Sequence, residues 1–122
     1  MLAGSAVVFT VHNLTASIAY YRDALGFDVT FQYGDPSFYA CLCRDEVSLH
    51  LRAANKPKKW LAGNGALCVF VKDVDFLHTE LVERGANVLQ PPRDYAYGMR
   101  DFDVTDPDGN QLTFGMESRL PA

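Results

Sequence analysis

The sequence lacks any apolar run long enough to cross a bilayer, and no basic segment leads into an apolar one near residue 1. We therefore expect neither a membrane-spanning helix nor a secretory signal. Lys and Arg number 11 against 15 Asp and Glu, so a nucleic-acid-binding surface is not expected either. Cysteines are also few, and an odd count of three predicts free thiols in a reducing cytoplasm rather than a disulfide framework.

What the chain does contain is an ordinary globular composition. Hydrophobic residues make up 48% and charged residues 21% of 122 positions, which is enough for one domain with a real core over residues 1–122. The formal net charge of −4 is compatible with a cationic ligand.

The first half of the chain combines strand-like segments with one helical segment. Stretches typical of β-strands occur at 5–12, 27–33, 38–43 and 47–52. A helix is expected between the first two, with Asn13 or Thr15 as its N-cap and Gly26 just past its end. The last two strands should form a hairpin around the turn residues Asp45 and Glu46.

The same order of elements then starts again after a polar stretch at 53–65, which is expected to be a linker. Strand-like segments follow at 66–71, 87–90, 99–106 and 110–114. A helix is expected over 73–85, with Leu77, Leu81 and Val82 on its buried face. The strand at 87–90 should stop at the two prolines that follow it.

An internal repeat accounts for this order. VHNL at 11–14 matches VKDV at 71–74, and each expected helix is followed by a glycine. The turn sequence DPDGN at 106–110 closes the last hairpin of the second copy. The pattern predicts an α+β fold of two βαβββ modules, about 5–52 and 66–115, joined by the linker.

Three stretches carry a resemblance to a known family: SIAYYRDALGFDV, SLHL and YGMRDFDVTDPDGNQLTF. They are similar to the glyoxalase / bleomycin-resistance / extradiol-dioxygenase superfamily, which has the vicinal-oxygen-chelate fold, and most of all to its bleomycin-resistance proteins. The resemblance covers nearly the whole chain. It implies that the two modules pair into a curved mixed sheet with a concave cup. It also implies a homodimer that holds a drug in crevices at the subunit interface without destroying it.

The metal enzymes of that superfamily take ligands from the first and last strands of each module. The resemblance places Ala6 and Ala66 at two ligand positions, and Thr113 where the enzymes have a glutamate after D-P-D-G. Only His50 could bind a metal, whereas catalytic metal sites usually need about three protein ligands. We therefore expect no metal, no cofactor and no catalytic residue. A metal-dependent lyase, dioxygenase or thiol transferase is the alternative.

Strand alternation predicts which side chains line the cup. With the turn at Asp45 and Glu46, Leu42 opposes Leu49 and both face the helix, so their neighbours face the cup. The predicted ligand-binding residues are Tyr39, Cys41, Ser48, His50, Trp60, Phe70, Tyr97, Met99, Asp101, Asp103 and Thr113.

Several of these residues have a plainer interpretation. Tyr39 and Phe70 either contact a ligand or only fill the cup with their own side chains. Trp60 either contacts a ligand or packs as a hydrophobic residue in a dimer interface. His50 either contacts a ligand or is a satisfied polar residue of the sheet. Cys41 is either a buried free thiol or one half of a nucleophile–base dyad with His50.

The sequence thus predicts a metal-free protein that sequesters a small molecule. Aromatic stacking would supply affinity, and acidic groups would favour a cationic aromatic antibiotic. Asp101 and Asp103 either supply that acidity or are solvated carboxylates at a sheet edge. A structural dimer without a ligand is the third hypothesis. The linker allows the two modules of one cup to come from one chain or from two.

Overall fold

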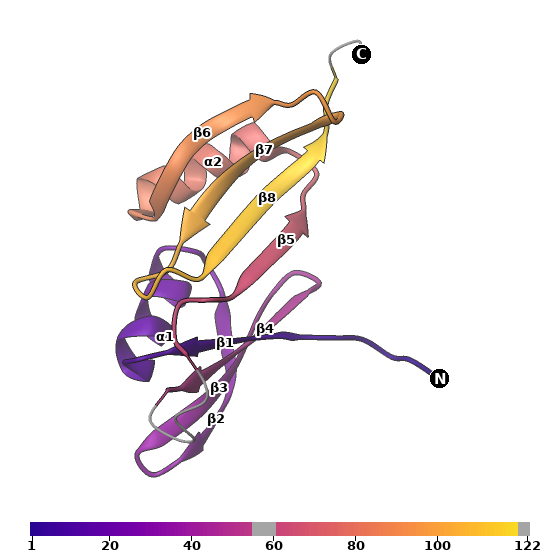
Figure 1. The fold of residues 1–122 in the computed structure, drawn as a ribbon. Helices are drawn as coiled ribbons and strands as arrows, with labels where there is room; N and C mark the ends of the chain where they lie inside the picture. Colours follow the sequence, from indigo (N-terminus) through magenta and orange to yellow (C-terminus); the bar gives the residue numbers. More distant parts are fainter. Residues whose placement is uncertain (55–60, 120–122) are drawn as a thin grey trace.

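The computed structural model of the protein describes residues 1–54 and 61–119, which form eight strands and two helices (Figure 1). The element order is βαβββ twice, so the predicted α+β fold of two such modules is confirmed. The elements are β1 Val7–Val11, α1 Leu14–Asp23, β2 Asp28–Gly34, β3 Ser37–Arg44, β4 Val47–Ala53, β5 Ala66–Phe70, α2 Val74–Arg84, β6 Asn87–Asp94, β7 Met99–Thr105 and β8 Gln111–Glu117. Within the described ranges, neither helix has the length and apolarity needed to cross a membrane.

Each half of the chain forms its own four-stranded sheet. Module one, Val7–Ala53, has the strand order β1-β4-β3-β2, and module two, Ala66–Glu117, has the order β5-β8-β7-β6. The first strand of each module lies at a sheet edge and is parallel to its only partner, while the other pairs are antiparallel. The two sheets are therefore mixed and follow the same plan.

Both helices begin at a side chain that accepts a hydrogen bond from the first turn. Asn13 caps α1, and Asp73 caps α2. Gly85 ends α2 in the left-handed conformation with φ of 89°. The prediction that Val82 faces the core is wrong, because this side chain is 52% exposed. The other two residues predicted for this face are confirmed: Leu81, about 100° away around the helix, is fully buried, and Leu77 is partly buried against the core.

The strand at 87–90 does not stop at the prolines, which is a second difference from the prediction. β6 continues through Pro91 and Pro92 to Asp94. It is an edge strand, and its register against β7 shifts between Gln90 and Arg93. Proline lacks the N–H that a regular ladder requires, so it is tolerated where an edge ladder is interrupted.

The DPDGN turn is organised by one carboxylate. Oδ1 of Asp106 accepts hydrogen bonds from the backbone N–H groups of Asp108, Gly109 and Asn110 at 2.9–3.0 Å. Its other oxygen accepts from the Tyr21 hydroxyl on α1 at 3.0 Å. Burial and the nearby carboxylate raise the pKa of Tyr21, so this phenol remains a donor.

The turn also fastens module two onto module one. Nδ2 of Asn110 donates to the carbonyl oxygen of Thr10 at the end of β1, and its Oδ1 accepts from the N–H of Gly65. Asp108 accepts from the backbone N–H of His12 and pairs with its ring at 2.6 Å. The sequence predicted a turn that closes a hairpin, whereas the structure shows that the same turn joins the two modules.

Candidate functional site

The face of each sheet that carries no helix is called the open face here, and in module one it follows the predicted alternation. Four apolar residues along β3 and β4 are buried on the α1 side: Ala40, Leu42, Leu49 and Leu51. The side chains between them are half-buried or exposed: Tyr39, Cys41, Cys43, Ser48, His50 and Arg52. The ladder pairs Cys41 with His50 and Leu42 with Leu49, so the predicted two-residue turn is confirmed.

Tyr39 and His50 meet on this open face. The hydroxyl oxygen of Tyr39 lies 2.8 Å from Nδ1 of His50, and the two rings meet edge to face at 5.4 Å. Burial raises the pKa of Tyr39, which keeps its hydroxyl protonated. One ring nitrogen of His50 is thus satisfied inside the sheet. Cys41 is its cross-strand neighbour, but the hydrogen bond of Nδ1 goes to the tyrosine.

Two aromatic residues of the same face were missed by the sequence reasoning. Phe31 pairs with Cys41 and Tyr33 pairs with Tyr39, so both lie on the open face at the edge strand β2. Their rings stack at 6.4 Å between centroids, and they are 55% and 61% exposed. The F-x-Y spacing was a usable signal, but the register shift after Val29 hides which face it occupies.

In module two the open face carries a buried carboxylate and a stacked tyrosine pair. Asp101 is buried and accepts a hydrogen bond from the Tyr97 hydroxyl at 2.7 Å. This bond is the main cause that raises the pKa of Tyr97 to about 12. Tyr97 stacks on Tyr95 at 5.1 Å, and the Arg93 guanidinium lies 4.9 Å from the Tyr95 ring. The interpretation of Asp101 as a solvated edge carboxylate is therefore wrong.

A second carboxylate lies on the neighbouring part of this face. Asp103 is half-buried and accepts hydrogen bonds from the Thr113 hydroxyl at 2.6 Å and from Nε2 of Gln90 at 3.3 Å. Nε2 of Gln111 in turn donates to the Thr113 hydroxyl at 3.3 Å. All of these donors are neutral. Arg93, the cross-strand partner of Asp101, brings one positive charge to the same face, and the two aspartates outweigh it, so the open face of module two keeps a negative character.

The residues at the positions that the resemblance assigns to metal ligands do not fit a metal ion. Ala6 and Ala66 carry no donor atom, and the Thr113 hydroxyl already donates to Asp103. His50 is alone among the four positions in having a ligand atom, and a catalytic site needs about three. In residues 1–54 and 61–119, no group of three or more His, Cys, Asp or Glu side chains is arranged to hold a metal.

The other predicted site residues are less uniform in position. Ser48 is exposed, Phe70 is 78% exposed on β5, and Met99 is half-buried at the start of β7. Cys68, on the same face of β5 as Phe70, is an exposed free thiol. Trp60 lies outside the described residues.

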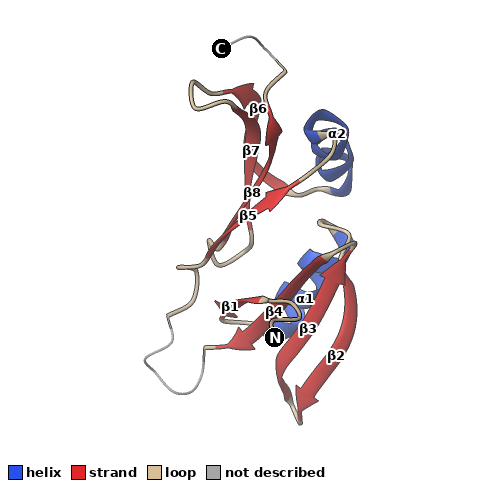
Figure 2. Cartoon of the chain, turned by 90° about the vertical axis from the view of Figure 1, so that its right-hand side faces the viewer, coloured by secondary structure: helices blue, strands red, loops and turns tan. Residues whose placement is uncertain are grey.

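The two open faces do not meet within this chain. β1 pairs only with β4, and β5 pairs only with β8, so no ladder joins the two sheets in the described residues. α1 lies to the left of its sheet in Figure 1, whereas α2 lies behind its own, and Figure 2 shows the same difference from the side. The faces opposite the helices therefore point in different directions.

Comparison with known proteins gives consistent relatives. A family model described as the Glyoxalase/Bleomycin resistance protein/Dioxygenase superfamily matches residues 5–114. A bleomycin resistance protein of Geobacillus stearothermophilus is 29% identical, with 85% of this chain and 89% of the relative aligned.

Solved structures show the same fold. A bleomycin-binding protein from bleomycin-producing Streptomyces verticillus, crystallised with copper(II)-bleomycin, has a TM-score of 0.79 and 24% identity, covering 97% of this chain and 98% of that one. A member of the superfamily from Sphaerobacter thermophilus has a TM-score of 0.80 and 21% identity, covering 96% of this chain and 98% of that one.

Proposed function

This chain belongs to the glyoxalase/bleomycin resistance protein/dioxygenase superfamily, and we propose that it is a metal-free homodimer that binds and sequesters a small molecule. The ligand class we propose is a cationic aromatic compound such as an antibiotic. The mechanism is binding that lowers the free concentration of the ligand, without covalent chemistry. The whole chain, 1–122, acts as one unit in this proposal.

The observation that carries the proposal is the contrast between the two open faces. Module one offers exposed stacked aromatics, Phe31 and Tyr33, beside the Tyr39–His50 pair. Module two offers two carboxylates and a stacked tyrosine pair. Aromatic faces bind planar rings, and carboxylates bind cations, so a ligand that carries both groups fits the combination.

The arrangement of the sheets supports a dimer. Within one chain the open faces point in different directions, while the outer edges of β1 and β5 have no strand partner among the described residues. If β1 of one chain pairs with β5 of a second copy, the two open faces become one continuous concave surface. A two-fold dimer makes two such cups, each built from module one of one chain and module two of the other.

The three cysteines support a cytoplasmic location, which is part of this proposal. Cys41, Cys43 and Cys68 are all free thiols, and none is fully buried. Partly exposed free thiols persist in a reducing compartment.

Calorimetric titration with metal-free and copper(II)-loaded bleomycin tests the proposal, alongside a thermal-shift panel of cationic and neutral planar compounds. We expect calorimetry to give one ligand per chain and sedimentation analysis to give a dimer, so that each dimer holds two ligands. We expect the cationic compounds to bind more tightly than the neutral ones. Elemental analysis of untagged protein should find well under one metal ion per chain. No binding by any cationic aromatic compound at about 100 μM protein would contradict sequestration, because that affinity would be too weak to lower a free drug concentration.

A further inference from the structure

The junction between the modules contains the chain's only asparagine that is followed by glycine, Asn64–Gly65. Asparagine is chemically labile, and most so before glycine, because a neighbour without a side chain lets the next backbone nitrogen approach the side-chain amide carbon. Asn64 is exposed, and its side chain makes no hydrogen bond among the described residues. Sequence and exposure alone would therefore make this pair deamidate readily.

The structure holds the nitrogen that would have to react. The N–H of Gly65 donates to Oδ1 of Asn110 at 2.8 Å, and the carbonyl oxygen of Gly65 accepts from the N–H of Gln111 at 2.9 Å. Asn110 is fully buried, and its Nδ2 donates to Asp106 and to the carbonyl oxygen of Thr10, which fixes the direction of its amide. Gly65 is thus held from both sides.

Close packing explains why a glycine stands at this position. A Cβ at residue 65 would collide with the ring of Phe9 and lie 2.9 Å from Oδ1 of Asn110. The space between β1 of module one and the turn of module two therefore admits only glycine here. The labile pair is a consequence of the tight junction, and the same junction restrains it.

We propose that Asn64 is a conditional deamidation site, which is protected while the two modules are joined and reacts when they part. In the open chain, the Gly65 nitrogen forms a bond to Cγ of Asn64 as the bond from Cγ to the side-chain nitrogen breaks. The proton of the Gly65 nitrogen leaves with that group as ammonia. Water then opens the resulting succinimide ring to aspartate or isoaspartate.

The reaction prevents the junction from closing as before. The succinimide has no N–H at position 65, which leaves Oδ1 of the buried Asn110 without its donor. Hydrolysis restores the N–H, but isoaspartate adds a methylene group to the main chain before residue 65 and displaces it. A brief opening thus leaves a lasting change, and the site marks molecules whose modules have parted. This inference does not depend on the proposed ligand or on the dimer.

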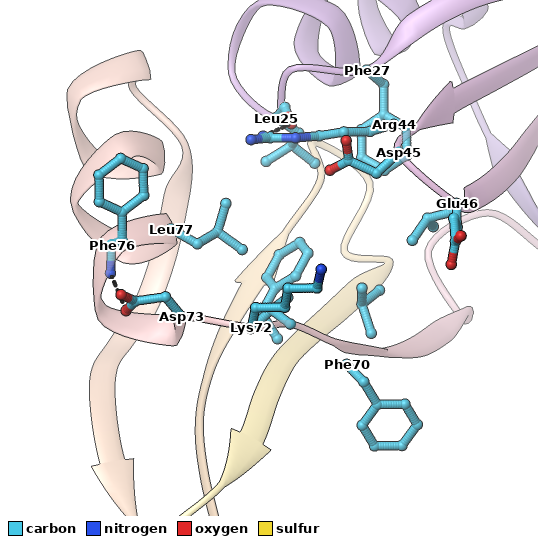
Figure 3. A pocket seen from close by; sticks show the side chains of 14 residues that line it. Leu25, Phe27, Arg44, Asp45, Glu46, Phe70, Lys72, Asp73, Phe76 and Leu77 are labelled. Atoms are coloured by element: carbon cyan, nitrogen blue, oxygen red, sulfur yellow. Dashed lines mark hydrogen bonds between the residues drawn. The ribbon is translucent and has the colours of Figure 1, made fainter.

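The space between the modules allows such openings. A groove of about 630 Å³ lies between them, so part of this space is not filled by side chains. Figure 3 shows the hairpin at Arg44–Glu46 of module one on one side of the groove and the start of α2 on the other. No ladder joins the two sheets in the described residues, so the modules can part while each keeps its own sheet.

Peptide mapping by mass spectrometry measures the conversion of Asn64 in the full chain at mildly alkaline pH. We expect conversion in the folded protein to be at least about tenfold slower than in guanidinium-unfolded protein, because a protected group reacts through its open population. Asn64→Gln is the matched control. It keeps the Gly65 N–H but would have to form a larger ring, so residue 64 should stay unmodified in both states. Equal conversion of Asn64 in folded and unfolded protein would overturn the protection.

Asn110→Ala tests the hydrogen bond itself, because it removes the acceptor of the Gly65 N–H. We expect the conversion of Asn64 and the amide hydrogen exchange of Gly65 both to rise at least about tenfold. Asn87→Ala removes an asparagine that bonds to Thr105 away from the junction, and it should change neither rate.

If Asn110→Ala does not fold, the unchanged protein in guanidinium below its unfolding transition gives the same comparison, and the two rates should rise in parallel. Faster exchange at Gly65 without faster conversion of Asn64 would overturn the proposal in either experiment. The isoaspartate form, isolated after conversion, should unfold at a lower denaturant concentration than the unchanged protein. Asn64→Asp adds the charge without the methylene group and should match the unchanged protein. An isoaspartate form of unchanged stability would overturn the lasting effect.

Discussion

The two modules have the same element order and strand order but different open faces. Cys41 and His50 of module one occupy the same ladder position as Asp103 and Thr113 of module two. The faces toward the helices are apolar in both modules, because burial of the core requires it. The open faces have no such requirement. The open face of module one is aromatic, whereas that of module two carries two carboxylates beside a stacked tyrosine pair. In the proposed dimer, a repeated fold would therefore present two different chemistries to one ligand.

The hairpin turns differ in the same way. Asp45 and Glu46 form a two-residue turn in module one whose exposed Asp45 has a φ of 51°. Module two uses the five residues at 106–110, and this turn contacts module one. The turn of one copy has therefore acquired inter-module contacts through its own residues, whereas beside the other turn Arg44 makes such a contact from the end of β3.

The largest expected effect is a loss of stability that occurs when the turn at 106–110 is changed but not when the turn at 45–46 is changed. Asp106→Asn places an amide NH2 opposite the Tyr21 hydroxyl and the Asn110 amide, which both donate in the unchanged protein. We expect a loss of about 2 kcal/mol or more in the free energy of unfolding, measured with urea. Asp45→Asn is the matched control and should change stability by less than about 0.5 kcal/mol, since Asn tolerates positive φ. Equal losses would remove the distinction between the turns.

The second largest effect concerns the tyrosines of the two open faces, whose pKa values are raised by different causes. The Asp101 carboxylate raises the pKa of Tyr97 to about 12, whereas burial is the main cause of the raised pKa of Tyr39. Asp101→Asn should lower the pKa of Tyr97 toward 10, measured as the pH midpoint of phenolate absorbance. Tyr97→Phe should remove that step from the titration and so assign it to Tyr97. A group whose pKa is higher in the folded than in the unfolded state stabilises the folded protein at pH values below its unfolded-state pKa. The contribution of this bond is therefore present below about pH 10 and is lost between about 10 and 12. An unchanged titration in Asp101→Asn would contradict the assignment.

Ligand affinity should depend on the acidic face. Asp103→Asn removes one negative charge from module two and should weaken bleomycin binding roughly tenfold by calorimetry. Glu83→Gln removes the same charge from an exposed position of α2 and should leave affinity unchanged. If both substitutions weaken binding equally, net charge rather than this face governs affinity.

The smallest effect concerns an ion pair between the modules. Arg44 donates to Glu80 at 2.8 Å, and this bond lowers the pKa of Glu80. Glu80 also pairs with Arg84 of its own helix at 2.8 Å, so Glu80→Gln removes both ion pairs. It should cost about 0.5 kcal/mol at neutral pH, because these groups are partly exposed. A carboxyl whose pKa is lowered by folding stabilises the folded protein at pH values above its unfolded-state pKa of about 4.5. The difference in free energy of unfolding between the two proteins should therefore vanish as the pH falls toward 3. Urea unfolding across this range measures it, with Glu83→Gln as the control. A difference that persists at low pH would point to a cause other than the charge.

The parts of the fold that depend on short-range patterns could be predicted from sequence. Alternation around the turn at 45–46 gave the facing of Cys41 and His50, because strand periodicity leaves two choices and burial decides between them. The position of Asp73 at the start of α2 was also predictable, because a capping side chain bonds to the N–H groups of the adjacent helical turn.

Features that depend on distant partners or broken periodicity could not be predicted. The contacts of the 106–110 turn with module one join residues far apart in the chain, and no local pattern encodes them. The register shift in β2 concealed that Phe31 and Tyr33 share the open face with Tyr39. Edge position, which sequence does not show, allows β6 to continue through its prolines.

The Tyr21–Asp106 bond also has a consequence for the order of events during synthesis. Module one leaves the ribosome first, yet the acceptor for its buried Tyr21 hydroxyl is made 85 residues later. The carbonyl oxygen of Thr10 accepts from the N–H of Gly63 and also from Nδ2 of Asn110, which lies 100 residues further along the chain. The nascent first half is therefore incomplete until nearly the last hairpin has emerged. A message truncated before the codon for Asp106 would consequently yield a chain whose intact first half is unstable as well, and a substrate for chaperones and proteases.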